Sequence, residues 1–431
     1  MAEGPTNFNP SELQAKHRSF SGAWTRSGPV RRVVITGVGA VSPFGAGADL
    51  MCAMISDGRC ALGPLPGGEH LKDLGARAAG LAPEVEAKSI PRTFRRSMSK
   101  MGIFACLAAR EALAGAGLEN YPPDMGLSVG TTMGSPQTLT EFFSEYLGSQ
   151  GFGNLRSTTF FKIMGHGAAS SLALALGLNG RTLAPSAACA AGLQAVGLGY
   201  EAIASGRENV MLCGGTEEFD VLTALTFDHI LAASHNPDPQ KASRPFDLAR
   251  DGLVCSEGAG MLVLESRDQA LARQAPIMAE IVGFATTTSP ANLVHPDPDG
   301  IAMCMRKALT DGGIPAEKID AVNAHATATV EGDKAEAEAI RLVLGSEVPV
   351  NSFKGQLGHT MAASGALELI VSLWMMNNSL FLPTYNLEQA DPALGPIRLP
   401  KEPQKRIIST LIKNSFALGG VNASLIVKKH G

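Results

Sequence analysis

The sequence is poor in aromatic and charged residues. Only 5% of its 431 residues are aromatic, with two Trp and four Tyr, and 18% are charged. The 36 basic and 40 acidic residues leave a net charge of −4 at pH 7. No run of basic side chains is interleaved with aromatic ones, which is the pattern expected of a surface that binds a phosphate backbone. Nucleic-acid binding is therefore not expected.

Disulfide, zinc and membrane signals are also missing. The seven cysteines are odd in number and no two have CxxC spacing, so neither a disulfide framework nor a structural zinc site is expected. No uninterrupted apolar run reaches about 18 residues, the length of a membrane span. The N-terminus lacks the apolar core of a secretory signal. The sequence predicts a cytoplasmic protein without a membrane span.

What the chain does have is apolar residues and glycine. Hydrophobic residues make up 45% of the sequence, and 48 residues are glycine, which suits a large, closely packed core. Residues 1–30 are polar and show no helix or strand period, so we predict a mobile N-terminal arm. From residue 31 onward we predict two halves, residues 31–277 and 278–431, each opening on a β-branched strand.

The two halves resemble each other in sequence. Gly37 and Gly283 follow the two opening strands, and paired glycines near a strand recur at 213–216 and 418–421, where we predict turns. The N-terminal half carries about 50 extra residues, which include the segment IPRTFRRSMSKMG. These features predict a duplicated α/β unit. Further matches, all 196 positions apart, are Ala112 with Ala308, Leu113 with Leu309, Gly117 with Gly313, Asp124 with Asp320, and Thr131 with Thr327.

Four ionisable side chains and one cysteine stand out from their small, apolar surroundings. Cys189 follows a Pro-Ser-Ala turn and precedes an Ala/Gly-rich helix, where the helix dipole would favour a thiolate nucleophile. An inert buried cysteine explains that segment equally well. His325 ends a predicted strand, where a structural histidine is more common than a catalytic one. Lys354, His359 and Glu368 surround one glycine turn and suggest a site.

Seven segments together resemble the β-ketoacyl-acyl-carrier-protein synthases of the thiolase superfamily, over residues 31–429. They are VVITGVGAVSPFG, IPRTFRRSM, SAACAAG, RPFDLARDGLVCSEGAGMLVLES, NAHATATVEGD, FKGQLGHTMAASGALE and NSFALGGVNASL, in the family's order and spacing. The resemblance implies a thiolase-like duplicated α/β fold, layered α-β-α-β-α with two mixed sheets. It also implies decarboxylative condensation of an acyl thioester with malonyl-carrier protein, without a metal or redox cofactor.

The same resemblance implies roles for individual residues. Cys189 would take the acyl chain, and His325, His359 and Lys354 would complete the catalytic set. The backbone N–H groups of Cys189 and Leu418 would form the oxyanion hole. The pantetheine arm of the carrier protein would lie against Thr327, Thr329, Phe416 and Leu418, Glu368 and Asp333 would support the site, and Arg92, Arg95, Arg96 and Lys100 would dock the carrier protein.

Two motifs depart from the family pattern. The chain has His-Ala-Thr-Ala-Thr at 325–329 where the family usually has His-Gly-Thr-Ser-Thr, and Phe-Ala-Leu-Gly-Gly at 416–420 where it has Phe-Gly-Phe-Gly-Gly. Because Ala417 and Leu418 replace a flexible glycine and a gating phenylalanine, we predict a changed acyl-chain preference with the chemistry retained.

Several alternatives stay open. The chain could act in fatty-acid biosynthesis or as the ketosynthase of a specialised polyketide or aryl-polyene pathway. It could also be a non-catalytic subunit of the chain-length-factor type, although such a subunit has no need of the catalytic set. Thiolases typically use a second cysteine in a C-terminal loop. No cysteine follows Cys304, so a thiolase is disfavoured. The resemblance implies a homodimer, or a heterodimer with a related subunit.

Overall fold

The computed structural model describes residues 30–430 except 69, 70, 72, 152, 154 and 290–295. The predicted N-terminal arm lies outside the described residues except for Val30. Within the described part of the chain, no helix is both long and apolar enough to cross a membrane. The division of the body at residue 277 stays a prediction.

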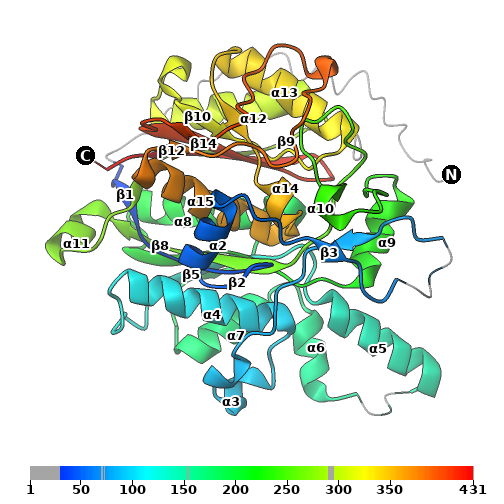
Figure 1. Cartoon of the computed structure of the whole chain (residues 1–431). Coiled ribbons are helices and arrows are strands. Elements are labelled where there is room, and N and C mark those ends of the chain that lie inside the picture. Colours follow the sequence, from blue (N-terminus) through cyan, green and yellow to red (C-terminus); the bar gives the residue numbers. More distant parts are fainter. Residues whose placement is uncertain are drawn as a thin grey trace, which may run out of the picture.

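One large mixed sheet runs through the described residues, which confirms the predicted α/β class (Figure 1). Its order is β11-β10-β14-β15-β9-β1-β8-β7-β5-β6, with β2 paired to β1. Neighbours are parallel at both ends, where β10 joins β11 and β14 and β5 joins β6 and β7, and antiparallel between them. The strands are β1 (Val33–Ser42), β2 (Gly45–Ala46), β5 (Gly126–Gly130), β6 (Thr182–Leu183), β7 (Val210–Glu217), β8 (Gly258–Ser266), β9 (Ala279–Thr288), β10 (Ala321–Asn323), β11 (Val350–Asn351), β14 (Thr410–Phe416) and β15 (Val421–Lys428), with short ribbons β3 (Gly63–Pro64) with β4 (Ala78–Ala79) and β12 (Leu380–Phe381) with β13 (Gln404–Lys405).

The expectation of two separate mixed sheets is wrong, because the main described strands of both halves form one continuous sheet. The start of β1, residues Val33 to Ile35, pairs with the start of β9, so hydrogen bonds join the two five-stranded parts into one path. Beyond Ile35, β1 is paired with β8 alone, apart from the hairpin with β2. A three-residue contact between strands far apart in the chain leaves no pattern in the sequence.

Helices form layers on and between the two parts of the sheet (Figure 1). Helices α8 and α15 pack in the middle, in one core with side chains of β7, β8, β14 and β15. Helices α4 and α7 cover the outer face of the first part, and α12 and α13 cover that of the second. The helices are α2 (Ala48–Ser56), α3 (Arg92–Arg95), α4 (Lys100–Gly115), α5 (Pro136–Ser149), α6 (Ser157–Ile163), α7 (Gly167–Leu176), α8 (Ala191–Ala204), α9 (Val221–His229), α10 (Pro239–Ala242), α11 (Arg267–Ala272), α12 (Pro298–Gly312), α13 (Val330–Leu344), α14 (Lys354–Leu357) and α15 (Ser364–Asn378).

The repeated glycines occupy equivalent places in the two halves. A Cβ on Gly37 of β1 would lie 2.1 Å from the carbonyl oxygen of Ala112 on α4, and a Cβ on Gly283 of β9 would lie 2.3 Å from that of Ala308 on α12. Each glycine therefore lets a helix lie against its strand. This supports the predicted duplication, but Gly37 lies within β1 rather than in a turn.

The paired glycines near the ends of the halves differ in structure. Residues 213–216 belong to strand β7, so the turn predicted there is wrong, whereas residues 418–420 form the predicted turn between β14 and β15. In β7 the glycines serve close packing. A Cβ on Gly215 would lie 2.2 Å from the carbonyl oxygen of Ala362, and a Cβ on Gly192 of α8 would lie equally close to it.

Replacing Gly215 by alanine is expected to destabilise the protein. The added Cβ meets a backbone oxygen, which cannot rotate away, so the short helix η5 (Met361–Ala363) must shift. Overpacking of this kind costs about 1–3 kcal/mol, measurable as a lower urea midpoint. The control is Gly148→Ala on α5, where nothing lies within 4 Å of the new Cβ. Equal midpoints for the two variants would contradict the packing role.

Candidate active site

Cys189 lies at the start of the central helix layer. It belongs to the short 3-10 helix η3 (Ala188–Ala190), which runs directly into α8. Ala188 has a φ of 44°, an uncommon value for a residue with a side chain. The strained backbone before Cys189 and the helix after it place the thiol in the wall of a pocket. Cys189 is 6% exposed. The predicted place of Cys189 at a helix start is confirmed.

The charge state predicted for this thiol is wrong for the free protein. Burial raises the pKa of Cys189 to about 12, although the nearby Lys354 ammonium opposes that rise. The loss of water around the sulfur outweighs the charge of Lys354. Cys189 is therefore a neutral thiol at pH 7 and needs a base before it can attack a substrate.

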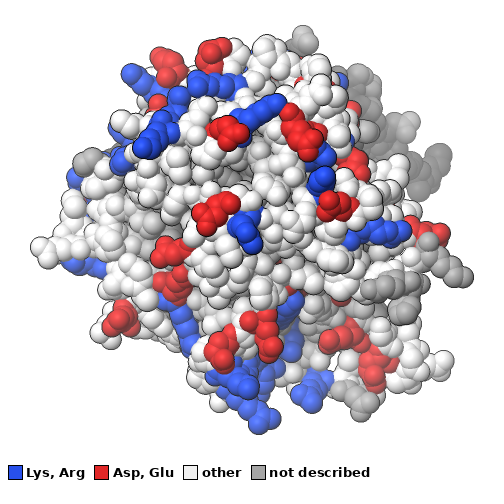
Figure 2. Space-filling view, viewed as in Figure 1, with Lys and Arg blue, Asp and Glu red and all other residues white. Residues whose placement is uncertain are grey.

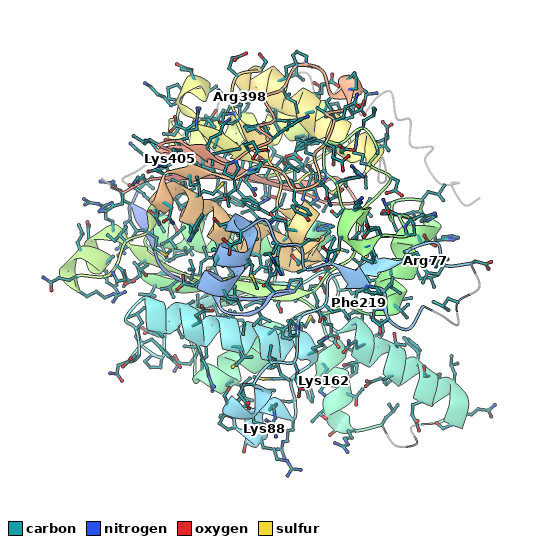
Figure 3. The ribbon with its side chains drawn as sticks, in the orientation of Figure 1. Arg77, Lys88, Lys162, Phe219, Arg398 and Lys405 are labelled. Carbon is teal, nitrogen blue, oxygen red and sulfur yellow. The ribbon has the colours of Figure 1, made fainter. Side chains whose placement is uncertain are left out.

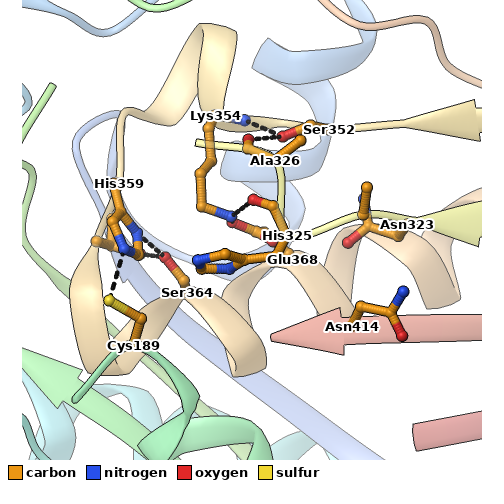
Figure 4. Close-up of polar contacts among 12 residues, drawn as sticks. Cys189, Asn323, His325, Ala326, Ser352, Lys354, His359, Ser364, Glu368 and Asn414 are labelled. Carbon is orange, nitrogen blue, oxygen red and sulfur yellow. Dashed lines mark hydrogen bonds and ion pairs between the residues drawn. The ribbon is translucent and has the colours of Figure 1, made fainter. Parts of the chain in front are cut away.

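His359 is placed to be that base. Its Nε2 lies 2.9 Å from the Cys189 Sγ, and its Nδ1 lies 3.0 Å from the Ser364 Oγ (Figure 4). The Ser364 hydroxyl in turn lies 3.1 Å from that of Thr360. A hydroxyl both donates and accepts, so Ser364 can pair with His359 whichever ring nitrogen carries the proton.

The side chain of His325 lies beside that of His359 in the wall of the same pocket. Its ring centroid lies 5.2 Å from that of His359 and 6.0 Å from that of Phe416. Its Nδ1 is buried with no hydrogen-bond partner among the described residues. A proton on Nδ1 would be buried without an acceptor, so the neutral ring is better served by a proton on Nε2.

Both histidines are uncharged at neutral pH. Burial lowers the pKa of His325 and of His359 well below 6.5, and the positive charges of Lys354 and Lys413 lower both further. A neutral imidazole can accept the Cys189 proton or donate an Nε2–H to a substrate oxygen. An imidazolium has no free nitrogen and cannot accept the proton.

A buried charge network lies behind the histidines. Lys354 and Lys413 each approach Glu368, with 2.6 Å between each Nζ and a carboxylate oxygen. Lys354 also donates to the carbonyl oxygen of His325 (Figure 4). Glu336 accepts from the backbone N–H of His325 at 2.9 Å. Lys354 and Glu368 were expected from the sequence, whereas Lys413, Glu336 and Ser364 were not. For Lys413 a weak signal was present, since it directly follows the apolar pair Leu411 and Ile412.

The predicted pantetheine-binding residues border the pocket. The pocket has a volume of about 330 Å³ and contains Cys189, His325 and His359 in its wall. The side chains of Thr327 and Thr329 contact each other there, with 3.1 Å between their hydroxyl oxygens. All four predicted binding residues line it: Thr327, Thr329, Phe416 and Leu418.

The remaining predicted residues lie elsewhere. Asp333 is buried in the first turn of α13, where it accepts from the backbone N–H groups of Phe246 and Ala328, and burial raises its pKa to about 7. It shapes the segment that follows His325 but is not in the pocket wall. Arg92, Arg95 and Arg96 lie on or just after α3, and Lys100 forms an ion pair of 2.7 Å with the buried Glu257.

The thiol and the two imidazoles also form a set of possible metal ligands. The ligand atoms of Cys189, His325 and His359 all lie within 4.8 Å of one another, and zinc prefers such atoms. Two buried lysine charges lie next to this set and oppose the approach of a cation. The same three atoms are sufficient for proton transfer and hydrogen bonding to a thioester.

The low histidine pKa values predict how activity depends on pH. Acyl transfer to Cys189 is expected to stay constant as the pH falls through 6.5 and to fall only well below it, because the neutral rings are the active form. Stability follows a different course. Below pH 6.5 the unfolded chain binds protons that the folded chain does not, so stability falls as the pH is lowered. Initial rates with circular dichroism at each pH separate the two effects, and half-loss of activity at pH 6.5 in folded protein would contradict the assignment.

Comparison with known proteins matches nearly the whole chain. Residues 30–270 match the model of the N-terminal domain of β-ketoacyl synthases, and residues 278–388 match that of the C-terminal domain. The 3-oxoacyl-[acyl-carrier-protein] synthase 1 of Escherichia coli K12 is 34% identical over 409 residues, which are 93% of this chain and 99% of the relative.

Solved structures agree. A β-ketoacyl synthase from Burkholderia phymatum STM815 has a TM-score of 0.90 and 37% identity, covering 93% of this chain and all of that one. The ishigamide ketosynthase/chain length factor has a TM-score of 0.86 and 32% identity over the same shares.

Proposed function

Since this chain belongs to the β-ketoacyl synthase family, we propose how its residues carry out acyl transfer and condensation in a 3-oxoacyl-[acyl-carrier-protein] synthase. The enzyme is an acyltransferase, and its relatives include 3-oxoacyl-[acyl-carrier-protein] synthases 1 and 2. The observation that carries the proposal is the 2.9 Å contact between the Cys189 Sγ and the His359 Nε2, with His325 beside it in one pocket.

The first step loads the acyl chain. His359 Nε2 takes the Cys189 proton, and the sulfur attacks the carbonyl carbon of an acyl thioester on the carrier protein. The backbone N–H groups of Cys189 and Leu418 hold the oxyanion, where one such donor typically contributes about 3–4 kcal/mol. The bond to the pantetheine sulfur then breaks, and that sulfur leaves with the proton from His359.

The second step condenses the bound chain with a malonyl thioester. The malonyl carboxylate leaves as CO₂, and its bonding electrons form an enolate whose oxygen accepts Nε2–H bonds from His325 and His359. The enolate carbon attacks the acyl carbonyl, and the bond to the Cys189 sulfur breaks. The expelled Cys189 thiolate takes up one proton, which comes from solvent, so a 3-oxoacyl thioester and the free thiol result.

The two steps need different tautomers of His359. Loading needs a bare Nε2 and therefore a proton on Nδ1, whereas condensation needs a proton on Nε2. Ser364 serves both, because its hydroxyl can accept from Nδ1–H or donate to bare Nδ1. His325 needs only the Nε2–H form, which is consistent with its unpaired Nδ1.

The pocket suits a carrier-bound substrate. Thr327 and Thr329 can hydrogen-bond the pantetheine arm beside the apolar Phe416 and Leu418. We assign the acyl carrier protein as the partner, consistent with the name of the Escherichia coli relative. The phosphopantetheine arrives on that protein, so the enzyme needs no cofactor of its own. A cytoplasmic location stays a prediction.

The basic segment around α3 is the proposed docking surface for the acidic carrier protein. Arg92 and Arg96 are exposed, and Figure 2 shows Lys and Arg side chains gathered where α3 lies. Figure 3 places Lys88 beside α3, with Lys162 nearby on α6. Opposite charges on two partners mainly raise the rate of association. Lys100 contributes less, because Glu257 already neutralises it.

A homodimer is proposed from one end of the sheet. The edge strand β6 has two residues and pairs only with β5 within the described chain, so its outer edge is open to a second copy. Apolar side chains on α5 and α6 are exposed, among them Leu147 at 70% and Phe160 at 60%. A related subunit in place of the second copy would give a heterodimer.

A specialised ketosynthase is the second candidate. Ala417 and Leu418 replace the usual glycine and phenylalanine of the loop beside Cys189, and Leu418 is 43% exposed at the pocket. The similarity to the ishigamide ketosynthase/chain length factor also favours it. The presence of Cys189 and both histidines disfavours a non-catalytic subunit.

Competition among acyl donors tests the proposal. The enzyme is incubated with an equimolar mixture of acyl-carrier proteins of different chain lengths, and its intact mass reports which acyl group it has gained. A preference for saturated medium chains would place the enzyme in fatty-acid biosynthesis. A strong preference for unsaturated or aromatic chains would place it in a specialised pathway. No acylation by any donor, alone or with a related subunit, would refute the condensing function.

A further inference from the structure

Lys413 is fully buried, and the proposed acyl transfer and condensation steps give it no role. It is on β14, next to Asn323 of β10 in the parallel pairing, and its residue is 0% exposed. A buried ammonium loses several kcal/mol of hydration and persists only where other groups replace the water. The position is therefore occupied by a lysine for a reason other than packing.

Three oxygen atoms replace that water. The Lys413 Nζ lies 2.6 Å from the Glu368 Oε2, 2.7 Å from the carbonyl oxygen of Asn414 and 3.5 Å from that of Ala324. A carboxylate and two carbonyls converging on one point form the kind of oxygen-lined site that holds a small, hard cation. The lysine supplies that cation from its own side chain.

The charges around this site balance. Glu368 on α15, Glu336 on α13 and Lys354 on α14 face Lys413, and each changes its pKa through its charge. Burial lowers the pKa of Lys413 to about 8, and the two carboxylates oppose that effect, so the ammonium stays protonated at pH 7. Two ammonium groups thus face two carboxylates, and removing Lys413 would leave a net negative charge under the active site.

The same groups hold the backbone on both sides of His325. Lys413 bonds the carbonyl oxygen of Ala324, and Lys354 bonds that of His325 itself. Glu336 accepts from the N–H groups of His325 and Ala326, at 2.9 and 2.7 Å. The peptide groups from Ala324 to Ala326 therefore form hydrogen bonds with the buried side chains of two lysines and Glu336, and both lysines form ion pairs with Glu368.

We propose that Lys413 is a positioning residue whose ammonium acts as a built-in monovalent cation, holding Glu368 and the 324–326 segment so that His325 faces the substrate. A further consequence is that the oxygen-lined site takes a free monovalent cation when the lysine side chain is shortened. The inference rests on the proposed condensing function and adds a residue and a ligand class to it.

Two substitutions test the proposal by different means. Lys413→Ala leaves space at the oxygen site, and Lys413→Met fills that space without a charge. Both variants are expected to condense about 100-fold more slowly, the typical cost of a misplaced catalytic group. Ammonium chloride is expected to restore much of the activity of Lys413→Ala, whereas tetramethylammonium chloride at the same ionic strength is too large to do so. Lys413→Met is expected to respond to neither salt.

The pH profile distinguishes positioning from a general loss of stability. The positive charge of Lys413 helps to keep the pKa values of both histidines low. In folded Lys413→Met the acid limb of the activity profile is therefore expected to move to higher pH. The control is Lys428→Met on the adjacent β15, an exposed lysine whose loss leaves the profile unchanged.

The results separate this inference from the function on which it rests. Wild-type activity together with full activity and an unshifted profile in Lys413→Met would overturn the role of Lys413 and leave the condensing function intact. Absence of ammonium rescue in folded, impaired Lys413→Ala would overturn the cation site. Inactive wild-type protein would instead refute the proposed function.

Discussion

Cys189→Ala is expected to abolish acyl loading and to lower condensation at least about 10⁴-fold, the scale on which removal of a nucleophile acts. Cys189 is the one cysteine among the described residues that line the pocket, and its Sγ lies 2.9 Å from the His359 Nε2, so its thiol is the group placed to form the thioester. Intact-mass analysis after incubation with acyl-carrier protein measures the effect directly, since the acyl adduct disappears.

The control for this variant is Cys304→Ala. Cys304 is also buried but lies on α12, outside the pocket, so the enzyme should still gain one acyl group. Decarboxylation of malonyl-carrier protein should survive in Cys189→Ala, because the enolate oxygen is held by His325 and His359. An acyl adduct on Cys189→Ala would show that another residue is the nucleophile.

Glu368→Gln is expected to have the second-largest effect. The substitution keeps the shape of the side chain but removes the charge that two buried ammonium groups share. Breaking a buried ion pair on one side costs about 3–5 kcal/mol, because the remaining charge is left without compensation. Urea denaturation should show this loss, and condensation should fall with it because the groups that hold His325 are displaced.

A matched variant removes a carboxylate from the surface. Glu119→Gln, which changes an exposed residue after α4, should alter stability by less than about 0.5 kcal/mol. If Glu368→Gln is as stable and as active as Glu119→Gln, the two lysines do not depend on Glu368, and the buried network does not position the active site.

Lys354 and His359 could be singled out from the sequence because they are ionisable residues in a segment of small residues. Cys189 and His325 each had a common structural explanation, and the resemblance to the β-ketoacyl-acyl-carrier-protein synthases implied their roles. The glycine pairs Gly37 and Gly283 likewise revealed the duplication, because each lets a helix approach its strand closely.

Burial and long-range contacts could not be found in this way. From the sequence, a thiolate at the helix start and an inert buried cysteine explain the Cys189 segment equally well, and only the fold shows that burial raises the pKa of this thiol to about 12. The pairing of Lys354 with Glu368 could be expected from the sequence, whereas Lys413 is 45 residues from Glu368 and only the fold brings the two together. The joining of the two parts of the sheet through Val33–Ile35 is equally invisible locally.

In the proposed mechanism, the acyl group on Cys189 is consumed by the carbanion that forms when malonyl-carrier protein loses CO₂. A single turnover of purified acyl-enzyme, mixed with malonyl-carrier protein labelled with ¹³C in its free carboxyl, tests this step. One labelled CO₂ and one 3-oxoacyl-carrier protein, two carbons longer than the acyl group, are expected for each acyl-enzyme lost. Release of labelled CO₂ while the acyl-enzyme persists would contradict this mechanism.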